Sequence, residues 1–541
     1  MQKKSSVKKK LYIAGSILLC LALAFWIFTS FFLDDILTSV TPEKLNNAIR
    51  VITHGRFIVK TGRITYHNGS IICRDFQLSR LHYDTSEQST TLKLFYADTI
   101  RFTGVSLWGL MMGKEVTMKS MEINMPKFYL TDAKKEEHSP DVVKDSIKLP
   151  VTSFDSVVLN DIRIFSPDLL HPNEQSSFEG MRVKLSGFLF NPESLSQAPL
   201  LYSKQVDFAV SSANYLSADS FYVMQLRNLR ARVADSLLLI DSFTYKPNYS
   251  EDVFALKHRY QTGSVKFCCT KLRMEGINIR RLSLADGLEF RKFETGSWFV
   301  DTYLDRRRPP DPHPPAVEMP NELLSSLPYT FNADSICLRN GMIRIRERAP
   351  GSLKPGVLFF DRANALLSPI VSDSGNKKFE TPTHISFNAY FIGQALLRSS
   401  WEYPLRHKSF DLTIHATLGS FDAKKLNAWL VPFERLEVTD GILDSGKIEM
   451  NIRSAVATTT VIPYYRNFSS KILPADVKKS GGLLEGFKTF WAKTFVVRSN
   501  NTNGNAKAGT TSLMHTSDQD LMQFIWRLLR KSLGQVVGGF Q

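Results

Sequence analysis

The sequence contains none of the short motifs that mark the commonest enzymes and nucleotide-binding proteins. GxSxG, HExxH and CxxC are absent, as are a Walker loop and a GxGxxG after a predicted strand. The eleven histidines are scattered, and no two of them have the spacing of a metal-binding pair. We therefore predict a protein that is not an enzyme and that holds no metal or other cofactor.

Cysteine is scarce. The 541 residues include five cysteines, none spaced like a metal site or a disulfide framework: Cys20, Cys73, Cys268, Cys269 and Cys337. Neighbouring residues of a strand point to opposite faces, which is the expectation for the adjacent Cys268 and Cys269. The sequence leaves open whether any of the last four cysteines is oxidised.

Long runs without charge are also missing, with one exception near the N-terminus. Residues 11–33 are 23 residues without a charged side chain. As a helix they would measure about 34 Å, enough to cross a hydrocarbon core of about 30 Å. Five lysines precede the run and two aspartates follow it. The positive-inside rule then puts residues 1–10 in the cytoplasm and residues 34–541 across the membrane.

Two other interpretations of this segment fit less well. A cleaved signal peptide has an apolar run of about 7–15 residues and a site of small residues, whereas this run is longer and ends in bulky side chains. A lipoprotein anchor at Cys20 would need a small residue where Leu19 stands.

Acidic residues are too few to balance the basic ones, and the formal charge is +16. Five of these charges come from the lysines of residues 1–10, and the other eleven are spread along the chain. The excess favours anionic lipid headgroups or a polyanion such as lipopolysaccharide. A basic surface with no partner is equally consistent with it. Nucleic acid is not an expected partner, because most of the chain should lie across a membrane from it.

Apolar and polar residues alternate with period two from about residue 55 to residue 475, in short runs broken by turn residues such as Asn68-Gly69. This pattern predicts a mainly β fold. Helices are expected near residues 41–53 and after residue 480. Two interruptions indicate linkers, namely the charged residues 131–148 and the arginine- and proline-rich residues 306–315.

Two segments repeat one strand–turn–strand pattern. Residues 149–164 and 327–345 both begin with Leu-Pro and reach an Asp-Ser pair followed by alternating apolar residues. Residues spaced by two point to one sheet face, whereas Arg163 and Arg344 should point to the other. The apolar members are our candidate ligand-binding residues: Val157, Leu159, Ile162, Ile164, Ile336, Leu338, Ile343 and Ile345.

The C-terminal residues change to a helical period. Residues 521–533 carry an apolar stripe with basic residues beside it, and Ser517 with Asp520 resembles a capping box. Such a helix packs on its own domain or lies on a membrane surface. The first is the commoner arrangement.

Three stretches of the sequence form a pattern found in a known family. One is the predicted anchor followed by the strand-like residues 55–78. A second is Ala97-Asp98 with residues 107–114 (LWGLMMGK) and an alternating run that ends in residues 125–130 (MPKFYL). A third is residues 436–448 (LEVTDGILDSGKI). In these stretches the sequence resembles the AsmA-like family of Gram-negative envelope proteins. Residues 165–320 resemble the family only in their general strand-like pattern.

The resemblance implies an elongated, curved, repetitive antiparallel β-sheet that forms a groove lined by apolar side chains. It places the chain in the inner membrane, single-pass, with its bulk in the periplasm. Its expected partners are membrane lipids, with outer-membrane or other envelope proteins as further candidates. Its expected function is phospholipid transport or outer-membrane homeostasis. A scaffold that assists outer-membrane protein assembly is the alternative.

These expectations give a provisional division of the chain. It comprises a basic tail (1–10), a transmembrane helix (11–33), an N-terminal β region (34–131), a middle β region (149–305), a linker (306–320) and a C-terminal β region with terminal amphipathic helices (321–541). Whether the candidate apolar residues line an open groove or fill a sandwich core stays open, because alternation is the same in both.

Overall fold

The computed structural model describes most of the chain after residue 56. The described residues are 57–62, 64–67, 70–80, 90–104, 115–132, 151–165, 177–191, 200–283, 286–404, 410–473 and 498–538. The predicted transmembrane helix and the helix expected at residues 41–53 lie outside them. Among the described residues, no helix combines the length and the apolar character needed to cross a membrane.

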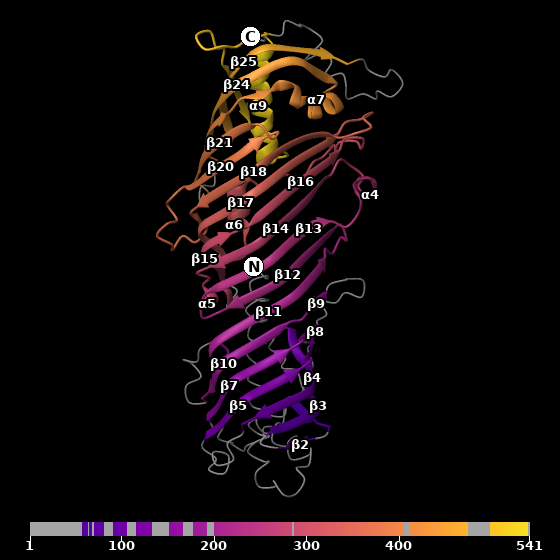
Figure 1. Ribbon diagram of the computed structural model, residues 1–541, viewed down its shortest axis with the longest axis vertical. Helices are drawn as coiled ribbons and strands as arrows, with labels where there is room; N and C mark the ends of the chain where they lie inside the picture. The colour runs from indigo at the N-terminus through magenta and orange to yellow at the C-terminus, as the bar shows by residue number, and fades with distance from the viewer. Residues whose placement is uncertain are drawn as a thin grey trace. The chain divides into compact units, whose positions relative to one another are not determined.

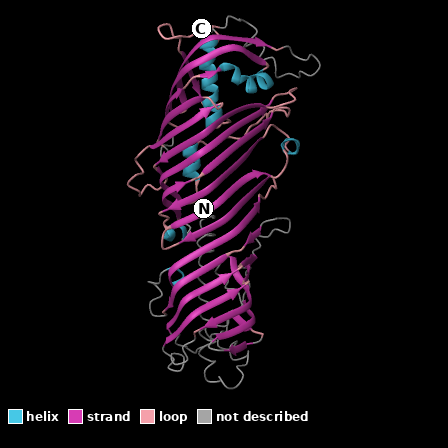
Figure 2. Ribbon diagram, in the orientation of Figure 1, coloured by secondary structure: helices cyan, strands magenta, loops and turns pink. Residues whose placement is uncertain are grey.

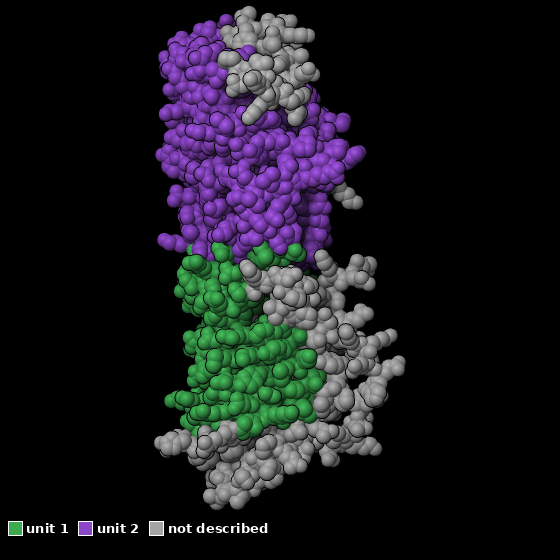
Figure 3. All heavy atoms as spheres, turned by 90° about the vertical axis from the view of Figure 1, so that its right-hand side faces the viewer, with its two compact units in different colours: residues 1–218, 225–241, 276–287 green, residues 219–224, 242–275, 288–541 purple. Residues whose placement is uncertain are grey.

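The chain is mainly β, as its period-two alternation predicted, and strands dominate throughout the ribbon (Figure 2). The 26 described strands belong to one hydrogen-bonded sheet. The chain divides into two compact units, coloured separately in Figure 3. Unit 1 comprises residues 1–218, 225–241 and 276–287, and unit 2 comprises residues 219–224, 242–275 and 288–541.

Unit 1 is built from the first strands of the chain (Figure 1). They are β1 (Phe57–Lys60), β2 (Ile64–His67), β3 (Ser70–Arg80), β4 (Thr90–Thr103), β5 (Glu115–Asn124), β6 (Lys127–Asp132), β7 (Val151–Asn160), β8 (Arg163–Phe165), β9 (Ser177–Glu179), β10 (Arg182–Phe190) and β11 (Ser203–Leu216). A 3-10 turn, η2 (Leu200–Tyr202), precedes β11, and α5 (Ile279–Ser283) also belongs to this unit.

Unit 2 contains the later strands and most of the described helices. Two strands, β12 (Tyr222–Arg232) and β13 (Leu237–Pro247), are divided between the units, and the first residue of β15 also belongs to unit 1. The others are β14 (Gly263–Glu275), β15 (Gly287–Glu294), β16 (Ser297–Asp305), β17 (Thr330–Arg348), β18 (Gly356–Ser368), β19 (Ile370–Val371), β20 (Thr383–Phe391), β21 (Ala395–Tyr403), β22 (Leu412–Leu418), β23 (Phe421–Asp422), β24 (Leu436–Arg453), β25 (Val456–Ile472) and β26 (Gly509–Met514). Its helices are α4 (Glu251–Lys257), α6 (Pro320–Ser326), η3 (Ala423–Leu426), α7 (Asn427–Glu434) and α9 (Leu521–Val537).

The sheet is mixed, which corrects the expectation of an antiparallel one. In unit 1, β5 pairs with β7 and β6 with β8 in parallel, and in unit 2 β16 pairs with β17 in parallel. Parallel neighbours need a crossover of about a dozen residues or more. In unit 2, residues 306–329 form the connection from β16 to β17. The arginine- and proline-rich residues 306–315 thus lie in a connection between two paired strands, whereas residues 133–148 of the other predicted linker lie outside the described residues.

Many long strands bend at a residue with positive φ. In the two repeats these residues are Asp161 (φ 53°) and Asn340 (φ 49°), and aspartate and asparagine tolerate this conformation better than most residues. The β17–β18 register shifts between Leu338 and Gly341. Such an irregularity takes one residue out of the alternation. Even-numbered residues before Asn340 and odd-numbered residues after it consequently share a face.

Unit 1 encloses a continuous core. Phe95 is fully buried, and its ring centroid lies 6.0 Å from that of Phe76 and 5.0 Å from that of Phe128. Phe154 packs edge-on to Phe188 at 5.6 Å in the same cluster. Buried side chains from β1, β3, β4, β5, β6, β7, β10 and β11 all belong to this one cluster.

The predicted C-terminal helix is confirmed as α9, which packs on β25 and β26 of its own unit. Phe524 and Leu528 are completely buried against β-strand residues such as Leu412 and Ile452. The capping box differs from the sequence expectation. It is formed by Asp520 and Gln523, with the Asp520 side chain accepting a hydrogen bond from the Gln523 backbone N–H at 2.8 Å.

Candidate functional site

One face of the central strands of unit 2 carries a row of apolar side chains, which we call the apolar stripe. Strand register places its members on the same face, because residues directly opposite each other in paired strands share a face. Phe267 lies opposite Val300, Val300 opposite Ile343, and Ile343 opposite Phe360. The stripe comprises Phe267, Val300, Ile336, Leu338, Ile343, Phe360, Phe387 and Leu397, all of them half-buried.

Two helices cover other parts of this face. The α9 helix packs on β25 and β26, and α7 packs on β17, β18 and β24. Under α7, Trp429 and Leu358 are buried with Ile345 beside them, and a Cβ added to Gly356 would lie 2.9 Å from the Trp429 carbonyl oxygen. The apolar stripe lies on the strands between these packed regions, where its side chains are not buried to core depth.

The opposite face of the same strands carries ion pairs between neighbouring strands. Asp301 on β16 accepts hydrogen bonds from Arg344 (2.6 and 3.0 Å) and from Arg346 (2.8 and 2.9 Å) on β17. Arg344 also lies over the Phe299 ring, 5.3 Å from its centroid. Burial raises the pKa of the Asp301 carboxyl, but the hydrogen bonds from the two arginines outweigh it and hold that pKa below its usual value. Arg344 thus lies on the face opposite Ile343 and Ile345, as the spacing predicted.

A polar cluster lies at the α7 end of this unit. The Arg306 Nε atom is 2.7 Å from Glu347 Oε2, and Glu434 at the end of α7 interacts electrostatically with Arg530 of α9 and with Arg306. Burial raises the pKa of Glu434 and lowers the pKa of Arg530. Charged groups therefore replace the apolar side chains beyond Ile345.

The structure divides the eight candidate residues between the two units. Val157, Leu159 and Ile162 are buried in the unit 1 core, whereas Ile164 is 39% exposed. The four candidates from the second repeat share one face of unit 2 and are half-buried, and they are Ile336, Leu338, Ile343 and Ile345. The two repeated segments thus have a similar local conformation, but, Ile164 apart, their apolar residues are buried in unit 1 and half-buried in unit 2.

Sequence reasoning did not single out five of the stripe residues. They are Phe267, Val300, Phe360, Phe387 and Leu397. The first four come from strands that are not consecutive in the chain and that sheet pairing brings together, and Leu397 lies on the strand that follows that of Phe387. Their alternation is visible in the sequence, for example in SFNAY at residues 386–390. Which strands lie next to each other depends on strand pairing, and the alternation of apolar and polar residues does not show that pairing.

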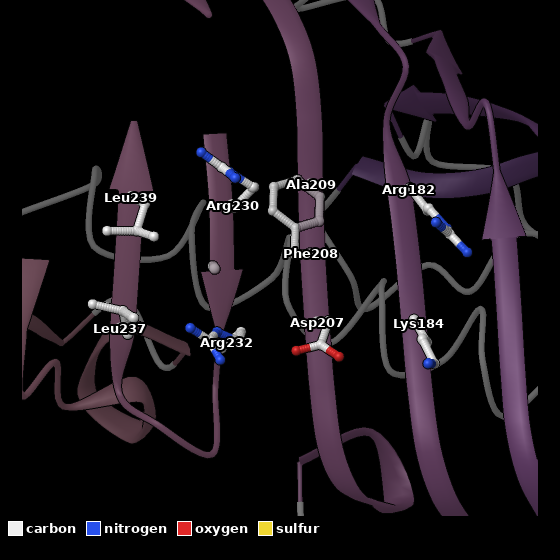
Figure 4. Close-up of a pocket in the computed structure, with 10 residues that line it drawn as sticks. Arg182, Lys184, Asp207, Phe208, Ala209, Arg230, Arg232, Leu237 and Leu239 are labelled. Carbon is white, nitrogen blue, oxygen red and sulfur yellow. The ribbon is translucent and has the colours of Figure 1, made fainter. Parts of the chain in front are cut away.

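A shallow pocket of about 400 Å³ in unit 1 is lined by β10, β11, β12 and β13 (Figure 4). Arg182 and Lys184 lie on one side of it, with Leu237 and Leu239 on another strand. Of the other two cations, Arg230 pairs with Asp241 at 2.9 Å and Arg232 with Asp235 at 3.1 Å. The ion pairs occupy these two guanidinium groups.

No cluster of three or more potential metal ligands occurs in the described part of the chain. The four cysteines within it are free thiols, and Cys269 is buried while its neighbour Cys268 is half-buried, as expected for opposite faces of a strand. Burial raises the pKa of the Cys73 thiol to about 12 and that of Cys269 to about 11. Thiols with such values are mostly protonated at neutral pH and are poor nucleophiles.

Comparison with known proteins identifies no relative: no protein-family model matches the sequence, and no curated protein or solved structure shows significant similarity to the chain.

Proposed function

We propose that this protein is anchored in the inner membrane by residues 11–33, and that in the periplasm it holds acyl chains of membrane phospholipids on the apolar stripe of unit 2. In this role it would take part in phospholipid transport or in outer-membrane homeostasis. The observation that carries the proposal is the stripe itself, which leaves apolar side chains partly exposed on one face while the other face is charged.

The stripe has dimensions that suit a lipid tail. It crosses six successive strands, β14, β16, β17, β18, β20 and β21. At a strand spacing of about 4.8 Å these cover roughly 24 Å. One leaflet of a hydrocarbon core about 30 Å thick gives an acyl chain roughly 15 Å. Covering the partly exposed side chains would contribute about 25 cal/mol for each Å² of apolar surface removed from water.

The sequence supports the location. The uncharged residues 11–33, with five lysines before them, are typical of a signal anchor, and the resemblance to the AsmA-like family points to the periplasm and to lipids. A scaffold for outer-membrane protein assembly would use the same anchor and sheet. That function predicts a bound protein strand where ours predicts a bound lipid.

The test is to extract the full chain from membranes in mild detergent and to quantify phospholipid that copurifies with it. Ile343→Asp places a charge in the stripe and should reduce the lipid per chain several-fold. Leu366→Asp is the matched control, because Leu366 is 44% exposed on the other face of β18. Wild-type protein free of lipid but bound to an outer-membrane protein would contradict our proposal and favour the scaffold.

A further inference from the structure

Two leucines of unit 2 are exposed far beyond what is usual for an apolar side chain. Leu353, in the turn between β17 and β18, is 90% exposed, and Leu256, at the end of α4, is 67% exposed. Val253 on α4 is also exposed. Single exposed apolar residues are common on soluble proteins, so the inference depends on how these residues are held and on what surrounds them.

The α4 helix is fixed in place although it is short. Its Phe254 and Ala255 are buried. Arg308 donates hydrogen bonds from Nε to the Ala255 carbonyl at 3.1 Å and from Nη2 to the Leu256 carbonyl at 2.7 Å. The arginine thereby satisfies carbonyl groups that the helix end leaves without an internal partner. Leu256 is consequently presented from a defined position.

The β17–β18 turn is ordered in a similar way. The Ser352 backbone N–H donates to the Ala349 carbonyl at 3.1 Å, and the Ser352 hydroxyl donates to the Lys354 carbonyl at 2.7 Å. Pro350 and Pro355 flank the exposed leucine and restrict the backbone further. Binding through Leu353 therefore requires little additional ordering of the chain.

Arg348 joins the turn to α4. Its Nε donates to the Ser352 carbonyl at 3.1 Å, and its Nη1 lies 3.3 Å from an Asp252 carboxylate oxygen. Arg348 thus places α4 beside the β17–β18 turn, and we call the exposed apolar and basic side chains of these two neighbouring segments the basic–apolar rim. It consists of Val253, Leu256, Lys257, Arg259, Leu353 and Lys354.

The rim carries positive charge that no carboxylate neutralises. Lys257, Arg259 and Lys354 are exposed, and within the described part of the chain none of the three forms an ion pair. Lys257 lies over the Tyr249 ring at 4.5 Å and Arg259 over the Tyr260 ring at 5.1 Å, contacts that leave their charge in place. The nearby acidic residues are occupied. Glu251 lies 2.6 Å from Arg346, and Asp252 lies 2.7 Å from Arg307.

We propose that the basic–apolar rim binds the surface of an anionic phospholipid bilayer, with Leu256 and Leu353 entering the acyl region and the three cations lying among the headgroups. Leucines bordered by lysine and arginine are the arrangement found on membrane-surface elements. Protein interfaces, in contrast, are depleted in lysine. This contact does not require lipid on the apolar stripe, so it goes beyond the proposed function.

The experiment is vesicle flotation with the full chain reconstituted in nanodiscs, so that any anchor is already in lipid. The probe vesicles contain phosphatidylcholine and phosphatidylglycerol in equal parts, or phosphatidylcholine alone. We expect the wild type to float with the anionic vesicles and much less with the neutral ones. The double variant Leu256→Asp/Leu353→Asp should lower the bound fraction about tenfold or more, because both apolar contacts are lost. Lys257→Glu/Lys354→Glu should lower it less and should weaken its salt dependence.

Leu366→Asp serves as the control and should bind as the wild type does, since Leu366 is an exposed leucine outside the rim. Both rim leucines are exposed, so thermal unfolding of the double variant should match the wild type. Flotation of the double variant at the wild-type level, or wild-type binding to neutral vesicles as strong as to anionic ones, would overturn the proposal. Lipid copurification is measured separately, so each proposal can fail without the other.

Discussion

The two units use the same alternation of apolar and polar residues in different ways. In unit 1 the apolar residues of β3, β4, β7 and β10 meet in one buried cluster. In unit 2 helices complete the core at α7 and α9, whereas the strands between keep a half-buried apolar stripe. The difference teaches that an apolar sheet face is a core only where a second layer covers it. Four predictions test this comparison.

The largest difference in stability should appear between two single variants, each of which places one charged side chain in one of the units. Val157→Asp puts an unpaired carboxylate into the filled core of unit 1 and should lower the free energy of unfolding by about 4 kcal/mol or more. Ile343→Asp on the apolar stripe should lower it by about 2 kcal/mol or less, because water reaches the site. Chemical denaturation of the two variants measures the difference. Equal losses would mean that the stripe is as dry as the unit 1 core.

Leu528→Ala tests a part of unit 2 where a helix covers the sheet. There a core substitution should destabilise unit 2 as it would in the core of unit 1. Leu528 is completely buried between α9 and the sheet, so its truncation leaves a cavity and should destabilise unit 2 by about 3 kcal/mol. Leu529→Ala is the neighbouring control with a partly buried side chain and should show a smaller effect. If both variants unfolded at the wild-type denaturant concentration, α9 would not be part of the folded core.

Gly341→Ala probes the bend of β17 beside the stripe. A Cβ at this position would overlap the Trp298 indole ring, so the strand or the ring must shift, and we expect a loss of about 2–3 kcal/mol. Gly263→Ala is the control, since the nearest atom to its added Cβ is the Tyr303 carbonyl oxygen at 4.0 Å. Similar melting temperatures for the two variants would show that the bend is not tightly packed.

The smallest effect concerns the charged face of unit 2. Asp301→Asn removes the carboxylate that pairs with Arg344 and Arg346 and should cost about 1–2 kcal/mol at pH 7. The folded protein lowers the pKa of this carboxyl, so its contribution is present above the ordinary aspartate value of about 3.9 and is lost as the pH falls through the lower folded value. The gap between wild type and variant should therefore narrow in acid. A gap that stays constant with pH would assign the loss to packing.

Periodicity was sufficient to predict the class of fold and one terminal element. Alternation with period two indicated strands. The helical spacing of the apolar residues in 521–533 indicated the helix observed as α9. The short helices α4, α6 and α7 were not predicted, because seven or eight residues give too little periodicity to detect. They are stabilised by tertiary contacts, such as the packing of Trp429 on the sheet.

The candidate site was predicted in part. The spacing of Ile336, Leu338, Ile343 and Ile345 indicated that each pair shares a face, and all four lie on one face of β17. The sequence had no means of showing that Val157 and Leu159, in the matching repeat, are covered. Coverage depends on residues far away in the chain, such as Phe95 and Leu185.

Local chemistry by itself determined that this chain forms strands, where several of them bend and which residues of a strand share a face. These properties follow from side-chain alternation and from the tolerance of aspartate and asparagine for positive φ. Tertiary structure alone decided that the sheet is mixed, that residues 306–315 lie in a connection between two paired parallel strands and that the apolar face is buried in unit 1 but partly open in unit 2. These features depend on pairing and packing between residues distant in sequence, and the strand pattern is the same whether or not another layer lies on it.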